Sequence, residues 1–173
     1  GIVIILGALV GSYLEATGGA LKLADMVIKL VGEKRPEIAM TLMGWIISIP
    51  VFCDSGFVIL NPIRKSIAQR TASSSVMLAL ALSGGLYIAH VFIPPTPGPI
   101  AAASTMGIGD DLLLVMGIGA LVSIFPIIAT IIVSRFLGKR EQSAEDLETD
   151  EIRETYEELV ASYGKLPNGF LTL

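Results

Sequence analysis

The 173-residue sequence predicts an all-α integral membrane protein in which transmembrane helices are combined with a re-entrant hairpin, a discontinuous helix and a short cytoplasmic helix. Hydrophobic residues make up 53% of the chain and charged residues only 16%, whereas an ordinary soluble domain carries about 25% charged residues. Several apolar runs are long enough to cross a bilayer, which takes about 20 residues of helix. Prolines and glycines interrupt two of these runs, and a proline inside a helix removes a hydrogen bond and clashes with the preceding turn.

The charged residues divide the sequence into two parts. Nine of the 16 acidic residues follow residue 140, so the net charge of −4 describes the tail and not the apolar body. We therefore expect a membrane transport domain over residues 1–137 and a cytoplasmic linker with a short amphipathic helix over residues 138–173. The chain begins within an apolar run and ends at "LPNGFLTL", which resembles the start of another one, so we expect a fragment of a longer protein.

The first 35 residues predict one membrane helix and one amphipathic helix. Residues 1–14 are typical of the later part of a transmembrane helix, which "EATGG" (15–19) interrupts. In residues 20–35 the apolar residues recur at helical spacing, with charged residues on the other side. This pattern favours a helix that lies at the membrane surface, and a water-exposed linker helix is the alternative.

Residues 38–63 are long enough to cross the membrane once, but the charges around them favour a re-entrant hairpin. Arg35 and further lysines precede this stretch, and Arg64 and a lysine follow it. A single crossing would place one basic cluster on the non-cytoplasmic side, against the positive-inside rule. A hairpin that turns at "IPVFCDSGF" brings both ends to the cytoplasm.

Residues 74–109 predict a broken helix, because four prolines fall within residues 94–99 ("PPTPGP"). The short apolar piece after the break ends at Asp110 and Asp111 without lysine or arginine, which fits an external face. A further helix over residues 112–135 returns to the cytoplasm.

Helix breaks at membrane depth are typical of substrate sites in secondary transporters. The N-terminus of a half-helix carries partial positive charge and free N–H donors, so it binds an anion without a buried lysine or arginine. The sequence predicts two such N-termini, one at Asp54, Ser55 and Gly56, and one after Gly98 with Pro99 at the first helical position. No lysine or arginine lies inside any predicted span, so backbone dipoles and hydroxyl groups would hold an anionic substrate.

Individual side chains at the breaks are candidates for binding and for proton coupling. Asp54, the one acid in the predicted membrane interior, either handles a proton or substrate or serves as the N-cap of the second hairpin arm. Two roles are open for His90: carrying a proton, or hydrogen-bonding the carbonyls freed at the break. The predicted substrate-binding residues are Asp54, Ser55, Gly56, Pro95, Thr96 and Gly98, and the predicted proton-coupling residues are Asp54 and His90.

Three segments carry a resemblance to a known family: "GSYLEATGGALKLA" (11–24), "FCDSGFVILNPI" (52–63) and "HVFIPPTPGPIAAA" (90–103). Their order and spacing resemble the gluconate permease family, proton symporters for gluconate and related acids, nearly throughout the chain. The resemblance implies the first half of such a permease with its central cytoplasmic linker. Its kinship with the broader ion-transporter superfamily implies inverted repeats and an elevator-like movement.

The expected function is therefore proton-coupled import of gluconate or a related small hydroxy or sugar acid across the inner (plasma) membrane, by a multi-pass protein. The proton is the coupling ion, and no cofactor is expected. The expected partners are a small organic anion, the lipid bilayer and the missing second half of the same chain, with a homodimer as an option. A carboxylate or D-serine-like amino-acid transporter of the same fold and a passive anion channel are the alternatives.

Other classes of function find no support in the sequence. No basic stripe is interleaved with aromatic residues, which disfavours nucleic-acid binding. The single cysteine, Cys53, excludes an internal disulfide and a CxxC metal site. An intramembrane enzyme is disfavoured because paired carboxylates, HExxH and GxSxG are absent from the predicted spans.

Overall fold

The computed structural model describes residues 2–32, 35–71 and 73–140, and this part of the chain is helical without strands. Its helices are α1 (Ile2–Ala16), α2 (Gly19–Val31), α3 (Pro36–Ile47), α4 (Cys53–Thr71), α5 (Ser75–Phe92), α6 (Pro97–Thr105) and α7 (Leu112–Arg140). The amphipathic helix predicted for the cytoplasmic linker falls after residue 140 and lies outside the described residues.

Two stretches of the described chain are long and apolar enough to cross a membrane, Ser75–Thr105 and Leu112–Arg140. The first contains α5 and α6, and the second is α7. Helix α7 exposes large apolar side chains from Leu113 to Phe136, as a helix does when lipid or further apolar protein surrounds it. The prediction of an all-α protein with membrane-spanning helices is confirmed at this level.

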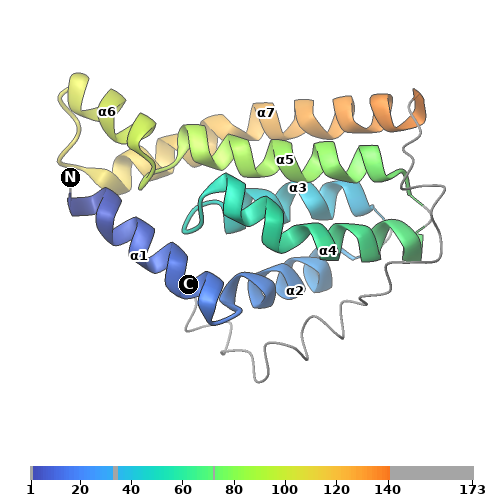
Figure 1. Ribbon diagram of the computed structural model, residues 1–173. Coiled ribbons are helices and arrows are strands. Elements are labelled where there is room, and N and C mark those ends of the chain that lie inside the picture. The colour runs from blue at the N-terminus through green and yellow to red at the C-terminus, as the bar shows by residue number, and fades with distance from the viewer. Residues whose placement is uncertain (1, 33–34, 72, 141–173) are drawn as a thin grey trace.

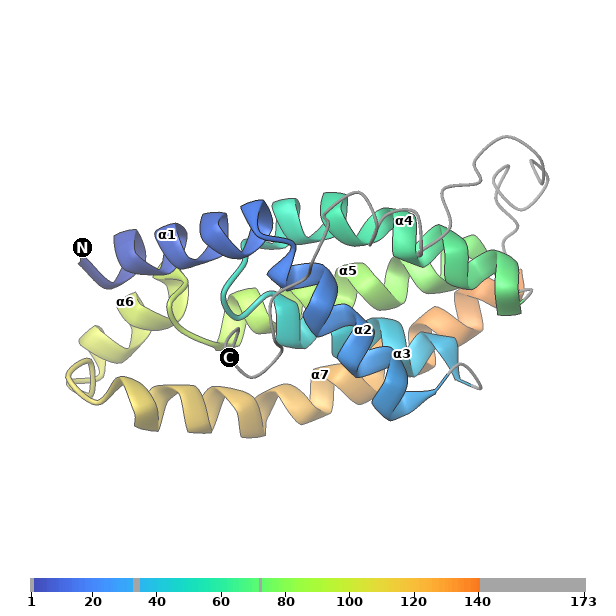
Figure 2. The same ribbon diagram turned by 90° about the horizontal axis from the view of Figure 1, so that it is seen from below.

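Helix α5 is the central helix of the bundle and packs against α3, α4, α6 and α7 (Figure 1). Helices α3 and α4 run in opposite directions, and the turn that joins them lies part-way along α5 (Figure 1). The start of α3, the end of α4, the start of α5 and the end of α7 gather at one end of the bundle. The start of α1, the start of α7 and all of α6 lie at the other end (Figure 2).

The hydrophobic core lies where α2, α3, α4 and α5 meet. Its largest fully buried side chains are Leu21, Met40, Met43, Ile47, Leu60, Ile63, Leu78, Leu82 and Leu86. Helices α3 and α5 approach closely because glycines face one another across the contact. A Cβ atom at Gly85 would overlap the carbonyl oxygen of Thr41, and one at Gly44 would lie 2.6 Å from the carbonyl oxygen of Leu82. Small residues therefore set the distance between these two helices, as they do in many membrane bundles.

Helix α2 is amphipathic, as its sequence pattern predicts, but its apolar face is covered by protein. Leu21, Ala24 and Val27 are buried in the core, where α2 contacts α3 and α4. The face that was expected to lie on the membrane surface therefore contacts protein, and the helix is not an exposed linker either. The spacing of apolar residues predicts a buried face and does not distinguish lipid from protein as its partner.

Charged contacts join the helices at the end of the bundle where α7 finishes. Glu37 on α3 is only 4% exposed, and its Oε1 accepts a hydrogen bond of 2.7 Å from Nε of Arg135 on α7. Arg64 on α4 is also buried, and it donates to Asn61 at 2.8 Å and to the carbonyl oxygen of Ser75 at 3.1 Å. The Glu37–Arg135 contact therefore joins α3 to α7, and the contact of Arg64 with Ser75 joins α4 to the start of α5.

Some helix boundaries differ from the predicted ones. Helix α4 continues to Thr71, beyond the predicted end at residue 63, since its polar last turns include buried side chains. Helix α6 begins at Pro97 and not at Pro99, because the first turn of a helix needs no intrahelical N–H bond and accepts both prolines. Helix α7 runs past residue 135 to Arg140 and contains Pro126 without ending there.

Candidate functional site

Two of the interruptions between helices in the described chain border one pocket. The first interruption, residues 48–52, separates α3 from α4, and the second, residues 93–96, separates α5 from α6. The pocket has an empty volume of about 230 Å³ and is partly open. Its lining residues are Ala8, Ser48, Ile49, Pro50, Val51, Phe52, Pro95 and Thr96. Segments that are far apart in the sequence thus form one site, and the described side chains that line it carry no charge.

Helix α4 begins directly beside this pocket. Its first hydrogen bond joins the N–H of Gly56 to the carbonyl oxygen of Phe52 at 2.9 Å. The N–H groups of residues 53–55 therefore have no acceptor within the helix, and they follow directly on the lining residue Phe52. The partial positive charge of the α4 N-terminus consequently lies next to the pocket.

Asp54 is the second residue of α4, and its side chain is exposed. The residue that precedes the helix is Phe52, so Asp54 lies within the first turn and is not the N-cap that one interpretation of the sequence expected. A carboxylate in the first turn interacts favourably with the helix dipole. The Sγ atom of Cys53 lies 3.7 Å from Oδ1 of Asp54, a weak contact that leaves the carboxylate open to other partners.

Thr96 closes the end of α5. This residue precedes α6 and is 4% exposed, but its hydroxyl makes no capping bond to α6. It turns back to α5 instead, where Oγ1 lies 2.7 Å from the carbonyl oxygen of His90 and 2.9 Å from that of Ile93. The single hydroxyl proton of Thr96 is thus shared between carbonyls that the break leaves without helical partners.

Replacing Thr96 by valine should destabilise the fold, because valine has nearly the same shape but no proton for the α5 carbonyls. We expect a loss of about 1–3 kcal/mol in the free energy of unfolding for Thr96→Val, as for a buried acceptor that loses its donor. Thr96→Ser is the matched control, since it keeps the hydroxyl and should lose less. Unfolding of the purified full-length protein in detergent measures the difference, and equal stability of the two variants would contradict this role.

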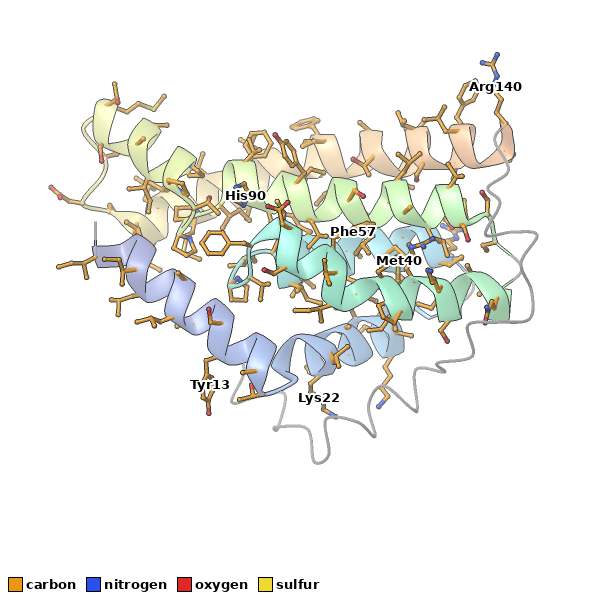
Figure 3. The ribbon with its side chains drawn as sticks, in the orientation of Figure 1. Tyr13, Lys22, Met40, Phe57, His90 and Arg140 are labelled. Carbon is orange, nitrogen blue, oxygen red and sulfur yellow. The ribbon has the colours of Figure 1, made fainter. Side chains whose placement is uncertain are left out.

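His90 lies on α5 close to the loop that precedes α4 (Figure 3). Its ring is 6.3 Å from that of Phe52 and stacks at 6.5 Å on that of Tyr87, measured between ring centroids. The buried Nδ1 atom has no hydrogen-bond partner in the described part of the chain. The sequence left open that His90 hydrogen-bonds the carbonyl groups freed at the helix break. Its Nδ1 atom does not do so, since the hydroxyl of Thr96 makes those bonds.

The structure brings only some of the predicted site residues into the pocket. Pro95 and Thr96 line it. The three residues from Asp54 to Gly56 do not, and they lie in the first turn of α4, which follows the lining residue Phe52 in the sequence. Gly98 lies in the first turn of α6, where a Cβ atom would meet nothing within 4 Å. Within the described ranges, no three His, Cys, Asp or Glu side chains come together to hold a metal ion.

Sequence reasoning missed the contributions of α1 and of the last turn of α3. Ala8 lines the pocket, and a Cβ atom at Gly11 would lie 2.5 Å from the carbonyl oxygen of Pro50 in the first interruption. The two glycines of "GALVG" (7–11), which are four positions apart, were the available signal, because that spacing lets another backbone approach a helix. Ser48, which also lines the pocket, had no signal of its own.

The chain is similar to known permeases along nearly all of its length. It is 36% identical to an uncharacterized permease of Haemophilus influenzae, over 100% of this chain and 36% of that protein. It is 35% identical to the inner membrane permease YgbN of Escherichia coli, over 91% of this chain and 35% of that protein. A gluconate permease of Pseudomonas aeruginosa is 32% identical over 65% of this chain and 26% of its own length. No solved structure matches the chain.

The chain spans about a third of the length of the first two of these relatives. The relatives are permeases, and the described helices include two that are long and apolar enough to cross a membrane. The family described as GntP family permease matches residues 1–172, which is nearly the whole sequence. The chain therefore belongs to the GntP permease family.

Proposed function

We propose that the full-length protein is a proton-coupled symporter that imports gluconate or a related small hydroxy or sugar acid across the inner (plasma) membrane. This chain supplies part of the substrate site, and the remainder of the same polypeptide supplies the rest. The observation that carries the proposal is the meeting of two helix interruptions at one uncharged pocket. Relatives named gluconate permease and low-affinity gluconate transporter support the choice of substrate.

The substrate carboxylate is held by backbone N–H groups and not by a cationic side chain. Helix α4 begins one residue after Phe52, and α6 begins one residue after Thr96, so both N-termini adjoin the pocket lining. Free N–H groups at a helix N-terminus bind anions through hydrogen bonds and the helix dipole together. In α6, prolines at positions 97 and 99 lack an N–H, which leaves Gly98 as the exposed donor of the first three residues.

In this proposal α3 and α4 form a re-entrant hairpin, and α5 and α6 form one discontinuous helix. The turn between α3 and α4 lies part-way along α5, while the other ends of both helices lie with the end of α7 (Figure 1). The buried Arg64 and the Glu37–Arg135 pair lie towards that end, which we assign to the cytoplasm by the positive-inside rule.

The hairpin predicts that Arg35 and Gln69, which are both exposed, lie on the same side of the membrane. Cysteines placed at these positions one at a time, in a Cys53→Ala background, should react with an impermeant thiol reagent from the cytoplasmic face only. A cysteine at the exposed Asp110 is the control and should react from the opposite face. Reaction of the first two positions from opposite faces would replace the hairpin by an ordinary membrane crossing.

Uptake by the full-length protein tests the proposed function. Reconstituted vesicles would be offered a panel of labelled acids, among them gluconate, glycerate and D-serine, with an imposed proton gradient and with an uncoupler. We expect accumulation of gluconate or another sugar acid above the external concentration, and loss of that accumulation with the uncoupler. Downhill flux that the uncoupler does not alter would indicate a passive anion channel instead. Accumulation of D-serine alone would indicate an amino-acid transporter of the same fold.

A further inference from the structure

Ser48 carries a buried hydroxyl group without a partner. The residue is 1% exposed and follows the last residue of α3, and its own N–H is satisfied by the carbonyl oxygen of Gly44 at 3.0 Å. Its Oγ atom makes no hydrogen bond with any part of the chain that the structure describes. A buried hydroxyl that stays unpaired destabilises the folded chain, because it has lost its hydrogen bonds to water and has gained none.

Several other serines and threonines in or next to the helices of the described chain do pair their hydroxyl group. Each of these hydroxyl groups donates to the carbonyl oxygen three or four residues earlier, at 2.6–3.1 Å. The residues that do so are Thr17, Thr41, Thr71, Ser83, Thr105, Ser123 and Ser134. The carbonyls of the last turn of α3 offer Ser48 the same type of bond, and the structure does not use it.

Ser48 lies on the wall of the pocket between the two helix interruptions. Among the lining residues that the structure describes, Thr96 has the only other polar side chain, and its proton is shared between two carbonyl oxygens at the end of α5. The Ser48 hydroxyl is therefore the lining side chain whose donor and acceptor are both free. This unpaired group is an observation independent of the helix N-termini, and it also points to a ligand in the pocket.

We propose that Ser48 hydrogen-bonds the hydroxyl group next to the substrate carboxylate and so makes the site selective for hydroxy acids. The inference rests on the proposed function and adds a specificity-determining residue to it. Helix N-termini are donors only and suit a carboxylate, whereas a serine hydroxyl both donates and accepts and suits another hydroxyl. The hydroxyl on carbon 2 is attached next to the carboxylate. With the carboxylate at the helix N-termini, it is therefore the substrate hydroxyl expected beside the pocket wall that Ser48 lines.

The test compares gluconate with 2-deoxygluconate as competitors of labelled gluconate uptake by the full-length protein. Wild type should bind gluconate more tightly by about tenfold or more, because the deoxy acid leaves a buried hydroxyl unpaired. Ser48→Ala should bring this preference close to one by weakening gluconate binding alone. Ser123→Ala is the matched control, since Ser123 is 0% exposed but donates to the carbonyl oxygen of Ala120 at 2.7 Å. It should keep the wild-type preference.

A second measurement is needed in case Ser48→Ala no longer transports substrate. Thermal stabilisation of the purified protein by each acid reports binding without transport. Stabilisation of Ser48→Ala by both acids to the same extent supports the proposal. Two results would overturn the role of Ser48 but not the proposed function. One is an unchanged preference in Ser48→Ala, and the other is a wild type that transports gluconate without preferring it to the deoxy acid. A wild type that neither accumulates nor binds any acid of the panel overturns the proposed function, and this inference with it.

Discussion

Gly119→Ala is expected to destabilise the bundle and to impair transport, although it adds only one methyl group. A Cβ atom at this position of α7 would overlap the carbonyl oxygen of Phe92 and lie 3.0 Å from its carbonyl carbon. Both atoms are backbone, so no side chain can rotate away, and α7 has to move away from α5. Overpacking of this kind costs about 1–3 kcal/mol. The displaced residue is the last of α5, so the strain falls beside the second interruption and the pocket.

Gly117→Ala is the matched control two residues earlier on the same helix. A Cβ atom there meets nothing within 4 Å, so the substitution should leave the free energy of unfolding unchanged or raise it slightly through helix propensity. Thermal unfolding of both purified full-length variants in detergent and gluconate uptake at equal expression measure the contrast. Equal stability of the two variants would mean that α5 and α7 are not in the close contact that the structure has.

The glycines also mark what the sequence can and cannot predict. Glycine in an apolar helix permits close packing, and Gly85 and Gly119 lie at such contacts in the structure. A Cβ atom at Gly117 meets nothing within 4 Å in the part of the chain that the structure describes, and Gly107 serves a turn with φ of 76°. A small residue permits close approach but does not say which helix approaches, since that depends on contacts between segments far apart in the sequence.

The same distinction applies to the candidate site. Both interruptions could be predicted, because proline and glycine act on the local backbone, and the structure has non-helical residues at both places. That the interruptions border one pocket, and that Ala8 of α1 lines it, follows from tertiary packing. The unpaired hydroxyl group of Ser48 could not be predicted either, because whether a buried atom has a hydrogen-bond partner depends on every residue that surrounds it in the fold. Sequence reasoning therefore found the segments of the site but, apart from Pro95 and Thr96, not the residues that line the pocket.

Asp54→Asn is expected to abolish accumulation of substrate while leaving exchange intact. Asp54 lies in the first turn of α4, next to the pocket where the proposed carboxylate binds, and its side chain is exposed. Two negative charges that lie close together repel one another, so in the proposed mechanism the binding of an anion favours uptake of a proton by the aspartate. In the proposed symporter this linkage would couple proton movement to substrate movement. Asparagine resembles the protonated form in size and charge, so it accepts the anion but has no proton to carry.

The measurement uses vesicles that contain the full-length protein with either an imposed pH gradient or internal unlabelled substrate. With one coupled proton, a gradient of one pH unit drives about tenfold accumulation in wild type and none in Asp54→Asn. Counterflow exchange should persist in the variant. Asp110→Asn is the matched control, because it removes the same charge at an exposed position outside the helices, and it should accumulate substrate as wild type does. Normal accumulation by Asp54→Asn would contradict a role of Asp54 in proton coupling. Asp54 would then serve only to stabilise the N-terminus of α4 through the helix dipole. His90, with its unpaired Nδ1, would then be the proton carrier to replace next.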